Sequence, residues 1–243
     1  ALFAQIHFSD YTAMDDPQWL GHALQTTALV LLLRHGGTVG LGRLAAAAAL
    51  LLLGGLVKQN LVALPLSATA WLALCKPRLL LSWGVLCLVG LAAVAALATA
   101  AYGRPFFDQV IFDHRGFTGT TLAWVGLHVL PFLLPFLLLG LCGFVLGRGN
   151  PTVQLVGIYA AVSAIVGVAS LSVQGVNGNA LFDLLIALMP LVAMLGPETE
   201  RCLGGRPWSA APMAVALALP FFAISPRLGQ VYDDESRDLA NAS

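Results

Sequence analysis

Two adjacent carboxylates precede the first long apolar run of this sequence. Asp15 and Asp16 come directly before Pro17, and an Asp followed by Pro is typical of a helix start, with the Asp as N-cap and the Pro in the first turn. Only one of the two can be the cap, so the other is left to bind a cation, a substrate hydroxyl or solvent. Because acids at the edge of an apolar region are costly, we treat both as candidate catalytic residues, with capping as the simpler alternative.

A cation and two amides interrupt the apolar sequence at Lys58, Gln59 and Asn60. The apolar runs on either side are too short to carry these side chains far into water, so they are costly to bury unless they are paired. An ammonium group near a bilayer surface is suited to binding phosphate. The pattern favours a polar cavity, and the alternative is an ordinary interfacial turn with Lys58 extended toward lipid headgroups.

Two further loops carry polar side chains that could contact a phosphate or a sugar. Arg104 and Arg115 flank a segment whose apolar residues share one helical face, which predicts a short helix in the membrane interface around residues 106–111. Asn179 and Asp183 are four residues apart at the start of another apolar run and share a face if that run is helical. Surface anchoring is the commoner explanation for such arginines, and the helix dipole alone would favour Asp183.

Several classes of function lack a basis in the sequence. The formal net charge is +0, with 12 basic and 12 acidic side chains, which removes the electrostatic case for a nucleic-acid partner. No Walker A, GxGxxG, HExxH or GxSxG motif occurs, and no spacing of His or Cys indicates a metal site. The four cysteines are far apart in sequence, and we interpret them as small apolar residues that fill space between helices. The cofactor stays unknown, and a divalent cation is left open.

The composition predicts that these residues are positioned by membrane-spanning helices. Of the 243 residues, 58% are hydrophobic and only 10% are charged, so lipid must be the main solvent. Since a helix needs about 20 apolar residues to cross a bilayer, we predict an all-α polytopic membrane protein with about eight spans and short loops. The run from residue 41 to 75 is too long for one crossing, so we expect a hairpin with Lys58 at its tip. The predicted spans are Trp19–Leu33, Leu41–Val57, Leu61–Cys75, Leu79–Ala101, Leu122–Leu146, Val153–Leu171, Ala180–Leu195 and Ala210–Ile224.

The basic residues predict the orientation of these spans, because cytoplasmic loops carry an excess of Lys and Arg. With the first residues outside, the larger share of the 12 basic residues falls on the inner side, and Lys58, Arg104 and Arg115 fall outside. Most carboxylates then lie on the extracytoplasmic face, and we expect chemistry there. The basic residues predicted inside are Arg34, Arg43, Lys76, Arg78, Arg148, Arg201 and Arg206.

Three stretches stand out together: residues 14–20 (MDDPQWL), residues 54–60 (GGLVKQN) with the ALP that follows at 63–65, and residues 175–183 (GVNGNALFD). In their order and spacing around the apolar runs they resemble bacterial membrane glycosyltransferases of the C superfamily, which include the protein mannosyltransferases and the aminoarabinose transferase. The resemblance runs from about Tyr11 to Leu195. Such enzymes pass a sugar from a polyprenyl-phosphate carrier to an acceptor outside the cytoplasmic membrane, using a carboxylate base in an outer cavity.

The resemblance implies a multi-pass protein of the bacterial inner membrane, a hexosyl or pentosyl transferase whose partners are membrane lipids and a polyprenyl-phosphate-linked sugar. It would place Asp15 or Asp16 near the cavity and Lys58 near the carrier phosphate. The family's first span and the outer loop with its main catalytic acid should precede Tyr11. We therefore expect residues 1–243 to be a single transmembrane domain and a fragment that lacks this acid, with 226–243 as a polar extracytoplasmic tail.

Other classes of function fit the same composition. A secondary transporter or lipid flippase also has many spans with few charges, but it needs polar residues near the bilayer midplane, whereas here they cluster at predicted span ends. A non-catalytic assembly subunit is a third class. The sequence does not indicate the sugar, the acceptor or the oligomeric state.

Overall fold

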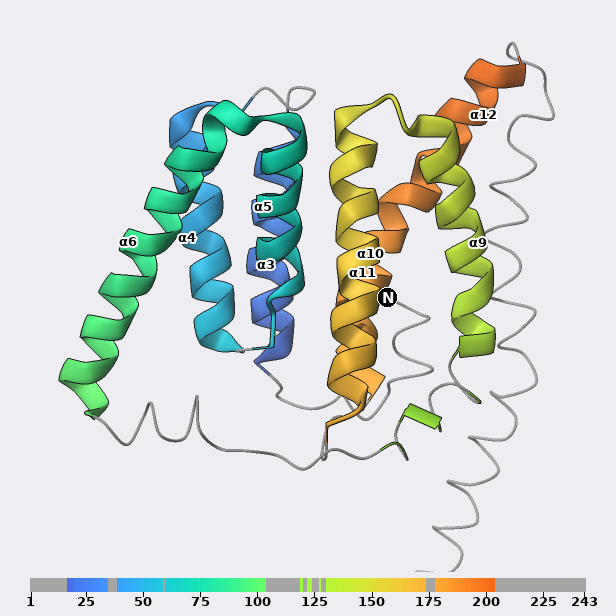
Figure 1. The fold of residues 1–243 in the computed structure, drawn as a ribbon. Helices are drawn as coiled ribbons and strands as arrows, with labels where there is room; N and C mark the ends of the chain where they lie inside the picture. Colours follow the sequence, from blue (N-terminus) through green and yellow to red (C-terminus); the bar gives the residue numbers. More distant parts are fainter. Residues whose placement is uncertain are drawn as a thin grey trace, which may run out of the picture. The chain divides into compact units, whose positions relative to one another are not determined.

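The computed structural model describes residues 17–34, 39–58, 60–103, 119, 122–123, 127, 130–173 and 178–203. Every element in these ranges is a helix (Figure 1), so the predicted all-α class is confirmed for this part of the chain. The predicted span Ala210–Ile224 and the predicted interfacial helix lie outside it. The elements are α3 (Gln18–Leu33), α4 (Leu41–Val57), α5 (Ala63–Cys75), α6 (Pro77–Tyr102), α9 (Leu130–Gly147), α10 (Pro151–Leu171), the 3₁₀ helix η1 (Gly178–Leu181), α11 (Phe182–Ala193) and α12 (Leu195–Leu203).

The chain divides into two compact units. The large unit comprises Asp16–Leu122 and Arg148–Ala187, and so contains α3 to α6, α10, η1 and the first residues of α11. The small unit comprises Ala1–Asp15, Ala123–Gly147 and Leu188–Ser243, with α9, the rest of α11 and α12. The predicted tail at 226–243 lies outside the described residues, so the predicted domain organisation stays a prediction.

Two glycines let α3 and α4 approach closely in the large unit. A methyl group on Gly54 would lie 3.3 Å from the carbonyl oxygen of Gly21 and 3.3 Å from Cγ of Gln25. Small residues at a crossing allow helix backbones to pack against each other, as in membrane proteins generally. The close approach holds the first turns of α3 against the end of α4, which brings the side chains of these two segments together.

The predicted hairpin is present. α4 has the predicted bounds, α5 begins at Ala63 instead of Leu61, and the two helices run in opposite directions from the connection that contains Lys58 (Figure 1). α4 ends where the polar connection begins, because backbone carbonyls of the connection accept hydrogen bonds from N–H groups just after them. The Leu61 N–H donates to the Lys58 carbonyl at 3.2 Å, and the Val62 N–H donates to the Asn60 carbonyl at 2.9 Å. Lys58 is therefore held at the tip.

Two of the described helices are long and apolar enough to cross a membrane. They are α6, with 26 residues, and α10, with 21 residues. Only 6% of the apolar stretch of α6 is buried, and Leu81 and Leu88 are 78% and 70% exposed. A helix that is apolar all round and left uncovered must contact lipid or another protein. The helices α4 and α5 are shorter, with 17 and 13 residues, so the predicted number of about eight spans stays a prediction.

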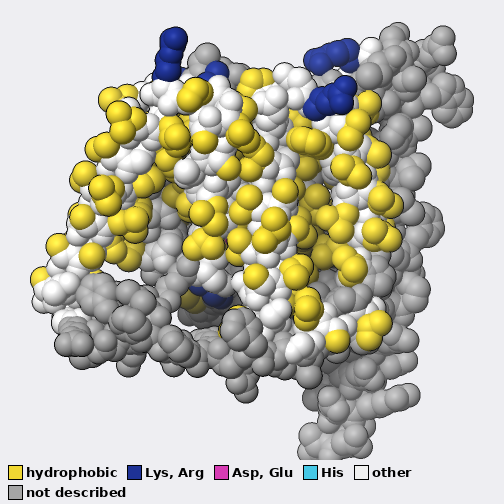
Figure 2. Space-filling view, in the orientation of Figure 1, with side chains coloured by type: hydrophobic (Ala, Val, Ile, Leu, Met, Phe, Trp, Pro, Cys, Tyr) yellow, Lys and Arg dark blue, Asp and Glu magenta, His cyan; other side chains and the backbone are white. Residues whose placement is uncertain are grey.

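Basic side chains of the large unit gather at the end opposite Lys58. Arg43 Nη1 donates to the Arg34 carbonyl at 3.1 Å, and the Cys75 thiol donates to Gln154 Oε1 at 3.2 Å, which ties the end of α5 to the start of α10. Figure 2 shows basic side chains at this edge and hydrophobic side chains over the face below it. The described basic residues at this end are Arg34, Arg43, Lys76, Arg78 and Arg148.

Candidate functional site: a buried polar network

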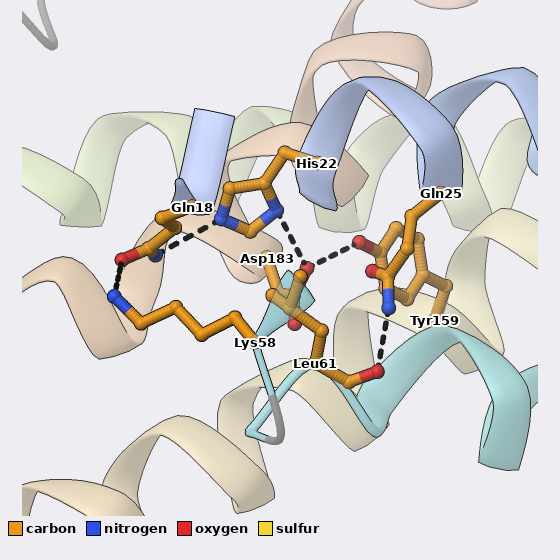
Figure 3. A network of polar contacts seen from close by, with 7 residues as sticks. All are labelled: Gln18, His22, Gln25, Lys58, Leu61, Tyr159 and Asp183. Atoms are coloured by element: carbon orange, nitrogen blue, oxygen red, sulfur yellow. Dashed lines mark hydrogen bonds and ion pairs between the residues drawn. The ribbon is translucent and has the colours of Figure 1, made fainter. Parts of the chain in front are cut away.

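A chain of polar side chains begins at the hairpin tip and runs into the large unit (Figure 3). Lys58 Nζ donates to Gln18 Oε1 at 2.6 Å, and Gln18 Nε2 lies 3.0 Å from His22 Nε2. Gln18 and His22 are one helical turn apart on α3, which is why both reach the same cavity. Gln18 is 2% exposed and His22 is 4% exposed, so these groups depend on one another for hydrogen bonds.

The identity of Lys58 sets the direction of every bond along this chain. An ammonium group can only donate, so the Gln18 atom that it contacts must be the carbonyl oxygen, and the Gln18 nitrogen must donate to His22. His22 Nε2 is then an acceptor without a proton. The neutral imidazole must carry its proton on Nδ1, which lies 3.3 Å from Asp183 Oδ1.

Asp183 is the acceptor on which the network converges. The Tyr159 hydroxyl donates to Asp183 Oδ1 at 2.8 Å, and the same oxygen faces His22 Nδ1 at 3.3 Å. His22 Nδ1 has no hydrogen-bond partner in the described residues, although it lies within ion-pair distance of Asp183. Asp183 is 6% exposed and Tyr159 is 1% exposed. The Tyr159 hydroxyl and the His22 ring therefore face the same buried carboxylate oxygen.

Aromatic packing and a close helix contact hold Asp183 in place. The ring of Phe182, the residue before it, lies 5.2 Å from the ring of Trp19 and 6.0 Å from that of His22, measured between centroids. On α10, a methyl group on Gly167 would lie 3.1 Å from the Ala180 carbonyl oxygen, so only a small residue lets η1 pack this closely. These contacts bring the first turn of α11 between α3 and α10.

A second amide on α3 supports the hairpin tip from inside. Gln25 Nε2 donates to the Leu61 carbonyl at 2.5 Å, which satisfies a backbone oxygen that precedes α5. Gln25 is 1% exposed, and its Oε1 has no hydrogen-bond partner within the described part of the chain. The connection that carries Lys58 is thus fixed to α3 at two points, through Gln18 and through Gln25.

A small cavity lies inside this network. It has a volume of about 10 Å³, which is about the room that one water molecule needs, and its walls include Gln18, His22, Asn60 and Asp183. Ser163 of α10 also lines it, is 1% exposed, and has a hydroxyl without a hydrogen-bond partner in the described residues. Unpaired buried polar atoms around a cavity indicate a place for water or for polar groups of a ligand.

The residues predicted from sequence are brought together in part. Lys58 lies against the first turn of α3, and Asn60 and Asp183 both line the cavity. α3 begins at Gln18, and Pro17 already has helical dihedral angles of −57° and −12°, so the helix starts at the predicted stretch. The backbone of Asn179 is described, but its side chain is not. The other predicted site residues lie outside the described residues: Asp15, Asp16, Gln59, Arg104 and Arg115.

The sequence analysis did not select four of the six side chains in the network, namely Gln18, His22, Gln25 and Tyr159. A signal was present: Gln18, His22 and Gln25 recur at one-turn spacing in an apolar run, which places three polar groups on one buried face. The prediction that polar residues cluster at span ends also needs correction, because Gln25 and Tyr159 lie in the middle of α3 and α10.

Comparison with known proteins adds no family to these observations. No family model, no curated protein and no solved structure matches the chain.

Proposed function

We propose that this chain is part of a membrane glycosyltransferase that takes a sugar from a polyprenyl-phosphate donor and passes it to an extracytoplasmic acceptor. The observation that carries the proposal is the part-buried contact of Lys58 with the head of α3, at the end of the large unit opposite its other described basic residues. By the positive-inside rule, the basic end would face the cytoplasm and Lys58 the outer side. A multi-pass location in the bacterial inner membrane, with about eight spans, is part of this proposal.

The proposed reaction needs one base and one cation. The acceptor hydroxyl oxygen attacks the anomeric carbon, the bond from that carbon to the phosphate oxygen breaks, and the hydroxyl proton passes to a carboxylate. The negative charge stays on the departing polyprenyl phosphate. Lys58 would stabilise this charge, and Asp15 or Asp16, just before α3, would be the base within the chain.

The other polar residues have supporting roles in the proposal. Asp183 lines the cavity and offers a carboxylate to a sugar hydroxyl, while His22 and Tyr159 hold that carboxylate in place. Gln59, Asn60 and Asn179 would contact the sugar or the phosphate, and Arg104 and Arg115 would contact the phosphate from the outer loop. The partners are the lipid-linked sugar and membrane lipids.

A transfer assay in membranes tests the proposal. Membranes that contain the protein are given a radiolabelled polyprenyl-phosphate sugar, and transfer to acceptor is compared for wild type, Lys58→Ala and Lys76→Ala. Loss of a single cationic contact to developing charge typically costs about 100-fold to 1,000-fold in rate. We expect that loss for Lys58→Ala only, because Lys76 lies at the opposite end of α5. If Lys58→Ala transfers as much sugar as Lys76→Ala, the assignment of Lys58 is contradicted. If Asp15→Ala/Asp16→Ala transfers as much sugar as wild type, the assignment of the base is contradicted.

A secondary transporter or lipid flippase is the second candidate, and one observation favours it. Tyr159 lies in the middle of the 21-residue α10, so the network extends from the helix end toward the centre of the unit. Transporters place their polar sites near the bilayer midplane. Uptake or lipid translocation by reconstituted vesicles that is lost in Tyr159→Phe, without any sugar transfer by wild type, would favour this candidate.

A further inference from the structure

One amide links the two basic side chains of the polar network. Gln18 Oε1 accepts from Lys58 Nζ at 2.6 Å, and Gln18 Nε2 lies 3.0 Å from His22 Nε2 (Figure 3). A primary amide has one end that accepts and one end that donates. Because the oxygen faces Lys58, the nitrogen must donate to a ring nitrogen that carries no proton. The observed arrangement therefore requires a neutral His22.

A second proton on the His22 ring is incompatible with this arrangement. An imidazolium ring donates from both nitrogens, so the ring Nε2 and the Gln18 Nε2 would be two donors 3.0 Å apart. Turning the amide over would offer its oxygen to His22, but it would then point the amide nitrogen at the Lys58 ammonium, which is also a donor. In either orientation, Gln18 can accept from only one of the two cations.

The titratable groups that face His22 decide which cation keeps the amide oxygen. On α11, Asp183 Oδ1 lies 3.3 Å from His22 Nδ1, and on α10 the Tyr159 hydroxyl donates to the same carboxyl oxygen at 2.8 Å. The hairpin contributes the Lys58 ammonium, which reaches the ring through Gln18. His22 is 4% exposed and has a carboxyl group at ion-pair distance, whereas Lys58 is half-buried at the hairpin tip. Lys58 is therefore the cation that can turn away.

We propose that Gln18 and His22 are positioning residues for Lys58, and that a proton on His22 breaks the bond between Lys58 and Gln18. The effect is reciprocal, because each of two linked events changes the free energy of the other by the same amount. A Lys58 held by Gln18 opposes protonation of His22, and an anion that draws the ammonium away from Gln18 favours it. The importance of this switch for catalysis rests on the proposed function, in which the anion is the lipid phosphate.

Solid-state NMR can follow the contact between Lys58 and Gln18 directly. Protein with ¹⁵N in the lysine side chains and ¹³C in the glutamine side-chain carbonyls is reconstituted in phosphatidylcholine vesicles at several pH values between about 5 and 8, where histidine changes its charge. Dephasing of the Lys58 ¹⁵N signal by glutamine ¹³C reports the contact, and Gln18→Leu shows which part of it comes from Gln18. The protonation of His22 is read from its ring ¹⁵N signals, which are assigned by their loss in His22→Met.

We expect the dephasing from Gln18 to be strong at about pH 8 and to fall at least several-fold as the His22 ring becomes charged, with one midpoint for both signals. In His22→Met the side chain cannot gain a proton, so the dephasing should stay at its high-pH level throughout. His22→Gln, which keeps an acceptor for the Gln18 nitrogen, is the second variant if the first does not fold. Dephasing that persists with a charged His22, a ring that stays neutral at about pH 5, or a loss that also occurs in the His22 variants overturns the proposal.

The switch and the proposed function can fail separately. The NMR samples contain neither sugar nor donor lipid, so a contact that follows the charge of His22 in a protein without transfer activity leaves the switch standing and contradicts the transferase. A sugar phosphodiester keeps one charge between about pH 5 and 8, so in the transfer assay the switch predicts a donor KM that rises several-fold over this range in wild type and stays constant in His22→Met. Transfer that depends on Lys58 but has the same KM profile in both proteins leaves the transferase standing and contradicts the control of Lys58 by His22.

Discussion

The contact between Tyr159 and Asp183 gives the sharpest prediction about the charge state of the network. Tyr159→Phe removes a donor to a buried carboxylate and leaves the packing of the ring in place. A hydrogen bond to a charged group contributes about 1.5–3 kcal/mol, whereas neutral interhelical bonds in membrane proteins average about 0.6 kcal/mol. The size of the coupling therefore reports whether Asp183 is ionised.

The assay is a double-mutant cycle of Tyr159→Phe and Asp183→Ala, because an Asn oxygen would still accept from the Tyr159 hydroxyl. The free energy of unfolding is measured for the four proteins in mixed micelles by tryptophan fluorescence, with Tyr102→Phe as control, because Tyr102 is 71% exposed. We expect a coupling of about 1.5 kcal/mol or more and an effect of less than about 0.5 kcal/mol for the control. A coupling near about 0.6 kcal/mol or below would contradict a charged acceptor at Asp183.

Three further predictions follow from the packing and the bond directions. Nitrogen NMR of histidine-labelled protein should show His22 with its proton on Nδ1 and a bare Nε2; the opposite tautomer would contradict the direction set by the lysine. Gly143→Ala should destabilise the small unit by about 1–3 kcal/mol, since the new methyl would meet the Leu191 carbonyl oxygen, and unchanged thermal stability would show that α9 and α11 do not pack this closely. In sealed cells with the native cysteines replaced, Asn60→Cys should react with an impermeant thiol reagent and Arg78→Cys should not; the reverse pattern would invert the proposed orientation.

The helices could be predicted from the sequence because apolar runs and their interruptions are local signals. Leu41–Val57 was predicted with the bounds that α4 has, and the break at Lys58 correctly divided the long apolar run into a hairpin. Whether each helix crosses the membrane could not be predicted in the same way, since crossing depends on the length of the helix. α5 has 13 residues and rises only about 20 Å, so its sequence alone does not decide whether it spans.

The site was harder to predict because its residues meet across the sequence. Lys58 was selected from its cost in an apolar region, and the structure gives it a partner, Gln18, 40 positions away. Tyr159 has no distinctive neighbours in sequence and gains its meaning only from Asp183. That meeting depends on the packing of η1 against α10, which no periodicity in one helix reveals.

The central claim, that Lys58 holds the carrier phosphate, can be measured with little ambiguity because the chain has only two lysines, Lys58 and Lys76, at opposite ends of α5. Protein labelled with ¹⁵N at the lysine side chains is reconstituted with polyprenyl phosphate, and dipolar coupling between ¹⁵N and ³¹P is measured by solid-state NMR. An ammonium that donates to a phosphate oxygen lies at about 2.8 Å from it. We expect ³¹P to dephase the ¹⁵N signal of Lys58 and not that of Lys76. The Lys76 signal is assigned as the one that disappears in the Lys76→Arg variant. Dephasing at Lys76 alone, or at neither lysine, would contradict the claim.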